Sequence, residues 1–123
     1  MKFNAVILAG GRLGEYAQKG HAPFRGRPLM ANAISAVREL GPSQIVVAAA
    51  PHPHFAMNAN ECYVPPSPKN GAWLSAYTAL NQLNDSPDPV LLVTGDLPFV
   101  TGVHLIPLME AACHRPDFLH YGL

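Results

Sequence analysis

The sequence has little charge, and the charge it has is balanced. Only 13% of its 123 residues are charged, and eight basic residues offset eight acidic ones. Proteins that bind nucleic acid or an anionic membrane usually carry an excess of Lys and Arg. We therefore expect neither nucleic acid nor a membrane as a partner.

Long apolar runs are also absent. The longest are far shorter than the roughly 20 residues that a membrane-spanning helix needs. The first eleven residues combine Lys2 with a short apolar run, as a signal peptide does. The run is too short, however, and Gly10-Gly11-Arg12 stands where a cleavage region would be. We expect no signal peptide.

Cysteine is scarce. Cys62 and Cys113 are the two cysteines, and their spacing does not resemble that of metal ligands. We expect both to be reduced, buried thiols in a cytoplasmic protein.

Apolar residues are plentiful, at 49% of the chain, and their pattern favours an α/β fold. Strands are predicted at 3–8, 45–49, 62–64 and 89–94, and helices at 28–40, 72–83 and 103–113, with a loop over 9–27. Pro28 suits a first helical turn, Gly41 suits the end of that helix, and Pro107 should start or kink the last helix. Alternation of strand and helix indicates parallel βαβ units.

The chain is expected to form one domain over residues 1–123 that is incomplete at its C-terminal end. Residues 117–123 have the composition of another strand, and an α/β nucleotide-binding domain usually needs more chain than this.

A glycine-rich loop follows the first predicted strand. The apolar run 5–8 leads directly into Ala9-Gly10-Gly11. Exposed backbone N–H groups at the end of a parallel strand bind phosphate well. The same glycines are equally compatible with a tight turn that needs a positive φ. The loop alone leaves both interpretations open.

Two common nucleotide-binding motifs fit this loop poorly. A P-loop would need Gly-Lys-Ser/Thr, which is absent. Ala9, Gly11 and Gly14 have the spacing of a degenerate dinucleotide motif, but that site also needs an acid after the second strand. The second predicted strand ends in alanines and Pro51 instead.

A single acid, Asp96, follows the strand predicted at 89–94. A carboxylate at the carboxyl end of a parallel strand lies beside the ligand crevice, and Mg²⁺ is usually held by carboxylate and phosphate oxygens. Asp96 is equally suited to cap the loop or the next helix. Its chemistry alone does not decide between these roles.

Three stretches together resemble one known family. These are LAGG at 8–11, KGHAPFRGRPLM at 19–30 and TGDLPF at 94–99. Their order and residue types are similar to those of the MobA-like nucleotidyltransferases. The resemblance implies a Rossmann-like, three-layer α/β/α fold with a mostly parallel sheet, of the nucleotide-diphospho-sugar transferase type.

The resemblance also implies the site. It identifies Lys19 and Asp96 as catalytic residues and Asp96 as the ligand of Mg²⁺. The nucleotide-binding residues that it implies are Leu8, Ala9, Gly10, Gly11, Lys19 and Gly71.

The implied reaction transfers NMP from an NTP to a small phosphorylated acceptor, with Mg²⁺ as cofactor and pyrophosphate as product. The family commonly has an Arg and a Gly where this sequence has Glu15 and Ala17, and its second metal-binding acid lies beyond Leu123. Two alternatives follow. One is an active enzyme, either as the N-terminal part of a longer protein or completed in a homodimer. The other is a non-catalytic nucleotide-binding module.

Overall fold

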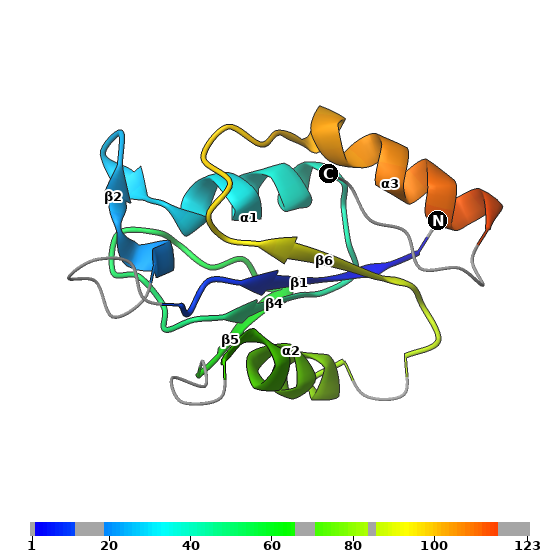
Figure 1. Cartoon of the computed structure of the whole chain (residues 1–123), viewed down its shortest axis with the longest axis horizontal. Coiled ribbons are helices and arrows are strands. Elements are labelled where there is room, and N and C mark those ends of the chain that lie inside the picture. Colours follow the sequence, from blue (N-terminus) through cyan, green and yellow to red (C-terminus); the bar gives the residue numbers. More distant parts are fainter. Residues whose placement is uncertain (1, 12–18, 66–70, 84–85, 116–123) are drawn as a thin grey trace.

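A computed structural model describes residues 2–11, 19–65, 71–83 and 86–115 (Figure 1). Its elements, in chain order, are β1 (Asn4–Leu8), η1 (Lys19–His21), β2 (Pro23–Phe24), β3 (Arg27–Pro28), α1 (Met30–Glu39), β4 (Ile45–Ala48), β5 (Glu61–Val64), α2 (Gly71–Asn81), β6 (Val90–Thr94) and α3 (Gly102–His114).

The main sheet has four parallel strands in the order β5-β4-β1-β6. Leu8, at the end of β1, pairs in register with Ala48 of β4 and Thr94 of β6. The segments that follow β1, β4 and β6 therefore leave the sheet at the same edge. Ligands bind at this carboxyl edge in open parallel sheets.

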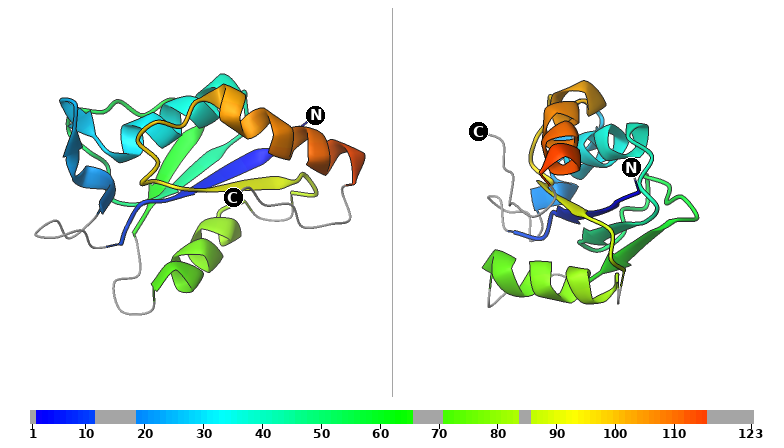
Figure 2. Two further views of the ribbon diagram at one scale, coloured as in Figure 1. Left: turned by 45° about the horizontal axis from the view of Figure 1, so that its top comes forward. Right: turned by 90° about the vertical axis from the view of Figure 1, so that its right-hand side faces the viewer.

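Helices cover both faces of the sheet. Figures 1 and 2 show α1 and α3 on one face and α2 on the other. Alternate residues of β1 divide accordingly, because successive side chains of a strand point to opposite faces. Ala5 and Ile7 pack in the core on the α1 side, whereas Val6 packs with Ala79 of α2 and with Leu83, which follows that helix. The expected three-layer α/β/α fold with a parallel sheet is confirmed.

The segment predicted as a loop contains more structure than its composition indicated. After the short η1, β2 and β3 form an antiparallel hairpin in which Pro23 pairs with Pro28. Pro28 thus belongs to a strand, and α1 begins only at Met30. The prediction of Pro28 in the first helical turn is wrong, because the backbone of Leu29 is held to Ala22 by a 2.8 Å hydrogen bond.

Two further predictions concern helix ends. Helix α1 ends at Glu39 and is followed by Gly41 with a φ of 69°, as its glycine signal indicated. Pro107 lies inside α3, which begins at Gly102, so it does not start that helix.

Both cysteines are free, but the prediction that they are buried is wrong, because both are exposed. Among the described residues, β5 has a neighbouring strand on one side only. Cys62 is on this strand, and Cys113 is in the last turn of α3. The strand expected at 117–123 lies outside the described residues. None of the described helices is long and apolar enough to cross a membrane.

Candidate nucleotide and metal site

The glycine loop and the segment after β6 are joined by main-chain hydrogen bonds at the carboxyl edge. The N–H of Gly95 donates to the carbonyl of Leu8 (2.7 Å), and the N–H of Gly20 donates to the carbonyl of Ala9 (3.0 Å). The N–H of Lys19 also donates to the carbonyl of Gly11. Lys19 and Gly20, which follow the loop, therefore lie against Ala9 and Gly11, where the loop begins, and the end of β6 lies beside them.

Ala9 is packed between two glycines. A Cβ atom at Gly20 would lie 2.7 Å from the Cβ of Ala9, and one at Gly95 would lie 2.6 Å from it. Both distances are shorter than any tolerable carbon contact, so the backbones approach this closely only because both residues are glycine. This packing fixes the start and end of the loop against the segment that carries Asp96.

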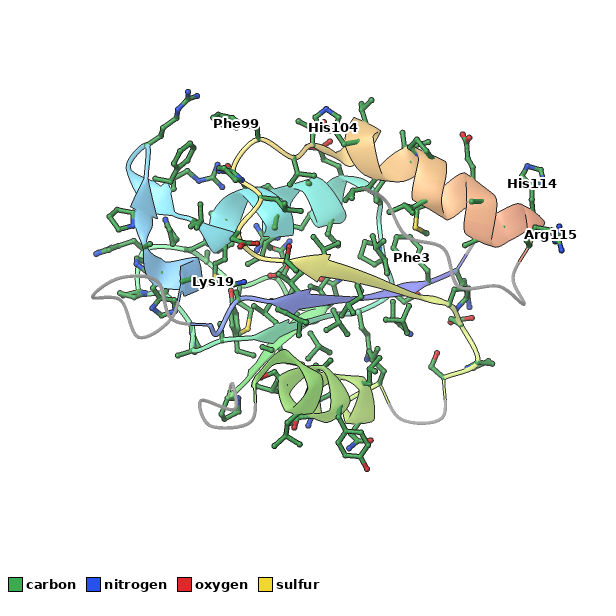
Figure 3. All side chains as sticks on the ribbon, in the orientation of Figure 1. Phe3, Lys19, Phe99, His104, His114 and Arg115 are labelled. Carbon is green, nitrogen blue, oxygen red and sulfur yellow. The ribbon has the colours of Figure 1, made fainter. Side chains whose placement is uncertain are left out.

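Lys19 and Asp96 meet at this edge although they are 77 residues apart in sequence. The Nζ of Lys19 lies 3.4 Å from Oδ2 of Asp96, and the two side chains are 25% and 44% exposed. Figure 3 shows Lys19 beside the carboxyl ends of β1 and β6. The methylene groups of Lys19 run past Gly11, whose missing Cβ would lie 3.6 Å from Cδ of Lys19. The pair is therefore accessible to a ligand lying on the loop.

The environment of Asp96 favours its charged form. Partial burial would raise the pKa of Asp96, but a hydrogen bond from Thr94 and the positive charge of Lys19 outweigh it and hold the pKa below its ordinary value. Asp96 is not the cap of the next helix. The N-cap of α3 is Thr101, whose backbone N–H donates to Nδ1 of His104 (3.1 Å). Helix capping therefore does not account for Asp96.

The donor chemistry of Asp96 suits Mg²⁺. An ionised, partly exposed carboxylate is a hard oxygen ligand, and Mg²⁺ typically takes one or two carboxylates together with substrate phosphates and water. Lys19 already places a positive charge against this carboxylate. Within the described ranges, no three His, Cys, Asp or Glu side chains gather closely enough to hold a metal on their own. A metal at Asp96 would therefore also need oxygens from water or from a ligand.

The structure brings most of the predicted site residues to one edge. Leu8 ends β1, Ala9 to Gly11 follow it, and Lys19 contacts Asp96. Gly71 is the first residue of α2, the helix that covers the opposite face of the sheet from α1. Glu15 and Ala17, where the sequence departs from the family pattern, lie outside the described residues.

Sequence reasoning missed the glycines that pack on Ala9 and two aromatic clusters near the site. The rings of His21 and His52 are in edge contact with centroids 5.2 Å apart, and Nε2 of His21 donates to the carbonyl of Ala50 (2.6 Å). The rings of Phe24 and Phe99 lie 5.5 Å apart. No local pattern links such distant positions. The motif residues themselves, Pro-Phe in both cases, were the available signal for the second cluster.

Comparison with known proteins identifies the family of this chain. The family model of the MobA-like NTP transferase domain matches residues 5–120. The bifunctional protein GlmU of Cupriavidus pinatubonensis is 34% identical over 116 residues, and that of Herminiimonas arsenicoxydans is 29% identical over 116 residues. Each match covers 89% of this chain and 25% of the relative, so the chain spans about a quarter of the length of these relatives.

Solved structures share the fold. A hypothetical transferase from Thermus thermophilus matches with a TM-score of 0.67 and 24% identity, over 91% of this chain and 47% of that one. Rv0371c from Mycobacterium tuberculosis matches with a TM-score of 0.69 and 20% identity, over 91% and 61%. A structure of Rv0371c in complex with manganese also matches, with a TM-score of 0.60 and 20% identity, over 90% and 59%.

Proposed function

The chain belongs to the family of MobA-like NTP transferase domains, and we propose that it transfers NMP from an NTP to a small phosphorylated acceptor with release of pyrophosphate. The observation that carries this proposal is the 3.4 Å contact between Lys19 and Asp96. It joins a cation and a carboxylate beside a glycine loop, at the sheet edge where ligands bind.

The residues of the loop would hold the triphosphate. Gly10 and Gly11 leave the backbone open above the end of β1, so their N–H groups are available to phosphate oxygens. Lys19 would move its ammonium group from Asp96 to the β- and γ-phosphates and balance the charge that builds up there. Leu8 and Ala9 would support the loop from beneath.

Asp96 would hold Mg²⁺ through its carboxylate. When bound, Mg²⁺ would supply charge neutralisation across the phosphates. An oxygen of the acceptor phosphate forms the new bond to the α-phosphorus, and the bond from that phosphorus to the bridging oxygen of pyrophosphate breaks. A phosphate acceptor is already an anion, so no side chain has to remove a proton. The chain would then contribute by positioning the two substrates and by balancing the charge of the phosphates.

A non-catalytic nucleotide-binding module is the second candidate. The observation that favours it is that, in the described part of the chain, no three His, Cys, Asp or Glu side chains are placed to hold a metal together. The GlmU relatives are also about four times as long as this chain, and the activity of a whole relative need not belong to this part. The two candidates differ in turnover, not in nucleotide binding.

The experiment that tests the proposal measures binding and turnover separately. Each of the four NTPs is titrated calorimetrically with and without Mg²⁺, and pyrophosphate release is then assayed with a panel of sugar phosphates and other phosphorylated alcohols. The proposal expects Mg²⁺-dependent binding of one NTP and pyrophosphate release with one acceptor class. Binding without release would favour the non-catalytic module. No binding of any NTP at millimolar concentration would exclude both.

A further inference from the structure

The side chain of Arg25 lies against two aromatic rings from different parts of the chain. Its Cζ is 5.4 Å from the ring centroid of Phe24 and 5.2 Å from that of Phe99. The two rings also contact each other edge to face, at 5.5 Å and an interplanar angle of 81°. We call Phe24, Arg25 and Phe99 the aromatic latch. It joins the β2–β3 hairpin to the segment between β6 and α3, where Figure 3 labels Phe99.

The backbone of Arg25 is unusual. Its φ is 51°, and it is the one non-glycine residue with a positive φ in the described part of the chain. Gly26 follows with a φ of 78° and completes the turn of the hairpin. A side chain in this region costs on the order of 1 kcal/mol, and Asn, Asp or Gly would relieve the cost. Arg25 therefore places a long, positively charged side chain at a turn position where Gly, Asn or Asp is usually favoured.

Each end of the latch is close in sequence to one residue of the candidate site. Phe24 is five residues after Lys19, and Phe99 is three residues after Asp96. Between Asp96 and Phe99 the chain lacks regular structure, and a long 3.4 Å hydrogen bond from Val100 to the carbonyl of Leu97 follows. The latch therefore restrains a segment that has few hydrogen bonds of its own.

The contact between Lys19 and Asp96 is a weak restraint on this segment. Exposed ion pairs contribute about 0–1 kcal/mol. In the proposed reaction, Lys19 turns to the triphosphate and Asp96 to the metal, so this contact is lost when the ligand binds. The packing of Gly20 and Gly95 on Ala9 still holds the chain next to Lys19 and Asp96, but the residues after Asp96 then need a further restraint.

We propose that Arg25 is a positioning residue: its contacts with Phe24 and Phe99 hold the segment that carries Asp96 against the hairpin that follows Lys19, so that both side chains remain at one edge after a metal–triphosphate ligand replaces their ion pair. This inference rests on the proposed function. Arg25 acts on Asp96 through Phe99, not by touching the ligand.

The test compares wild type with Arg25→Gly, Phe99→Leu and the double variant. Arg25→Gly relieves the positive φ, and Phe99→Leu keeps an apolar side chain without a π-face, so both should fold. Arg27→Ala is the matched control, because Arg27 lies on the same hairpin but contacts Phe55 and Ser35 instead.

Two quantities are measured on the full chain. One is the amide hydrogen-exchange rate of Val100 without ligand. The other is the affinity for Mn²⁺ with whichever of the four NTPs binds most tightly. We expect each latch variant to raise the exchange rate and weaken Mn²⁺ binding by about three- to ten-fold, as the loss of one or two exposed cation–π contacts implies. The double variant should be no worse than either single variant, and Arg27→Ala should change neither quantity.

Other outcomes overturn the inference. Unchanged Val100 exchange in Arg25→Gly would show that the latch does not restrain the segment. Faster exchange with wild-type Mn²⁺ affinity would show that the restraint does not position Asp96. Weaker nucleotide binding in Arg25→Gly alone, with Phe99→Leu unaffected, would mean that Arg25 contacts phosphate directly. If wild type binds no Mn²⁺, the proposed function fails, whereas the exchange rates still decide whether the latch holds the segment.

Discussion

Two ion pairs in this molecule differ in nearly every physical respect. Arg38 and Glu61 form a bidentate pair with distances of 2.5 and 2.7 Å, and the side chain of Glu61 is completely buried. Lys19 and Asp96 share one contact of 3.4 Å, with both side chains partly exposed. The first pair joins α1 to β5, and the second lies at the carboxyl edge of the sheet.

The difference separates a structural contact from one that a ligand can replace. Glu61 also accepts the N–H of Asn58 (2.9 Å), and Arg38 also donates to the carbonyl of Ala56 (2.8 Å) and lies over the ring of Phe55. These partners leave both carboxylate oxygens of Glu61 hydrogen-bonded. Asp96 keeps open coordination positions, because Lys19 and Thr94 occupy only part of its carboxylate.

The largest effect should come from breaking the buried pair. Arg38→Met removes the guanidinium and leaves Glu61 as a buried, unpaired charge. We expect a loss of about 3 kcal/mol in the free energy of unfolding, measured in urea. The double variant Arg38→Met/Glu61→Gln removes both charges and should recover part of that loss. A loss below 1 kcal/mol in the single variant would show that the pair is not structural.

Gly95→Ala tests the edge of the site itself. The new Cβ would lie 2.6 Å from the Cβ of Ala9 and 3.1 Å from its Cα, so backbone must move. We expect a loss of about 2 kcal/mol by urea unfolding. Gly11→Ala is the control, because its Cβ would meet Lys19 at an ordinary 3.6 Å and should cost much less. Equal losses would contradict the close packing of Ala9.

Lowering the pH should affect stability differently through Glu61 and through Asp96. Burial raises the pKa of Glu61, but the hydrogen bonds from Arg38 and Asn58 outweigh it, so the net pKa lies below the ordinary value of 4.5. A lowered folded-state pKa adds stability above the unfolded-state pKa, and this stability is lost as the pH falls through the folded-state pKa.

The stability difference between wild type and Glu61→Gln should therefore be largest above about pH 4.5 and shrink below it. The difference for Asp96→Asn should change much less, because solvent screens its partly exposed contact. Urea unfolding at several pH values measures both. A difference for Glu61→Gln that is constant with pH would contradict this account.

The smallest effect on stability should come from Lys19→Ala. Losing an exposed contact should cost less than about 1 kcal/mol. The same change should weaken triphosphate binding far more than monophosphate binding, as calorimetry with NTP and NMP can measure. Equal weakening of both would make Lys19 a surface residue without a role at the β- and γ-phosphates.

The main elements of the fold could be predicted from local pattern. The runs that became β1 and β4 are apolar because a sheet covered on both faces buries both sides of its central strands. The run that became β6 is equally apolar, although Val90 and Leu92 of this outer strand are exposed. The exposed cysteines could not be predicted in this way. Cys62 is on β5, an outer strand of the described sheet, and strand order is a property of the whole chain.

Part of the candidate site could also be predicted from local pattern, and part of it could not. Motif residues identified the loop and Asp96, and strand order explains why Asp96 lies beside Lys19: β6 is next to β1. The packing of Gly20 and Gly95 on Ala9 depends on contacts between positions far apart in sequence. The latch depends on Arg25 adopting a φ that its residue type rarely adopts. Neither is visible in a local pattern.

Mn²⁺ binding tests the central claim most directly, namely that the Asp96 carboxylate is open to a metal held jointly with a triphosphate. Paramagnetic resonance titration of Mn²⁺ would compare wild type with Asp96→Asn, in the presence and absence of the NTP that binds most tightly. We predict that the NTP strengthens Mn²⁺ binding to wild type and that Asp96→Asn weakens it at least about ten-fold without changing stability by more than about 1 kcal/mol. Equal Mn²⁺ affinity in both proteins would contradict the claim.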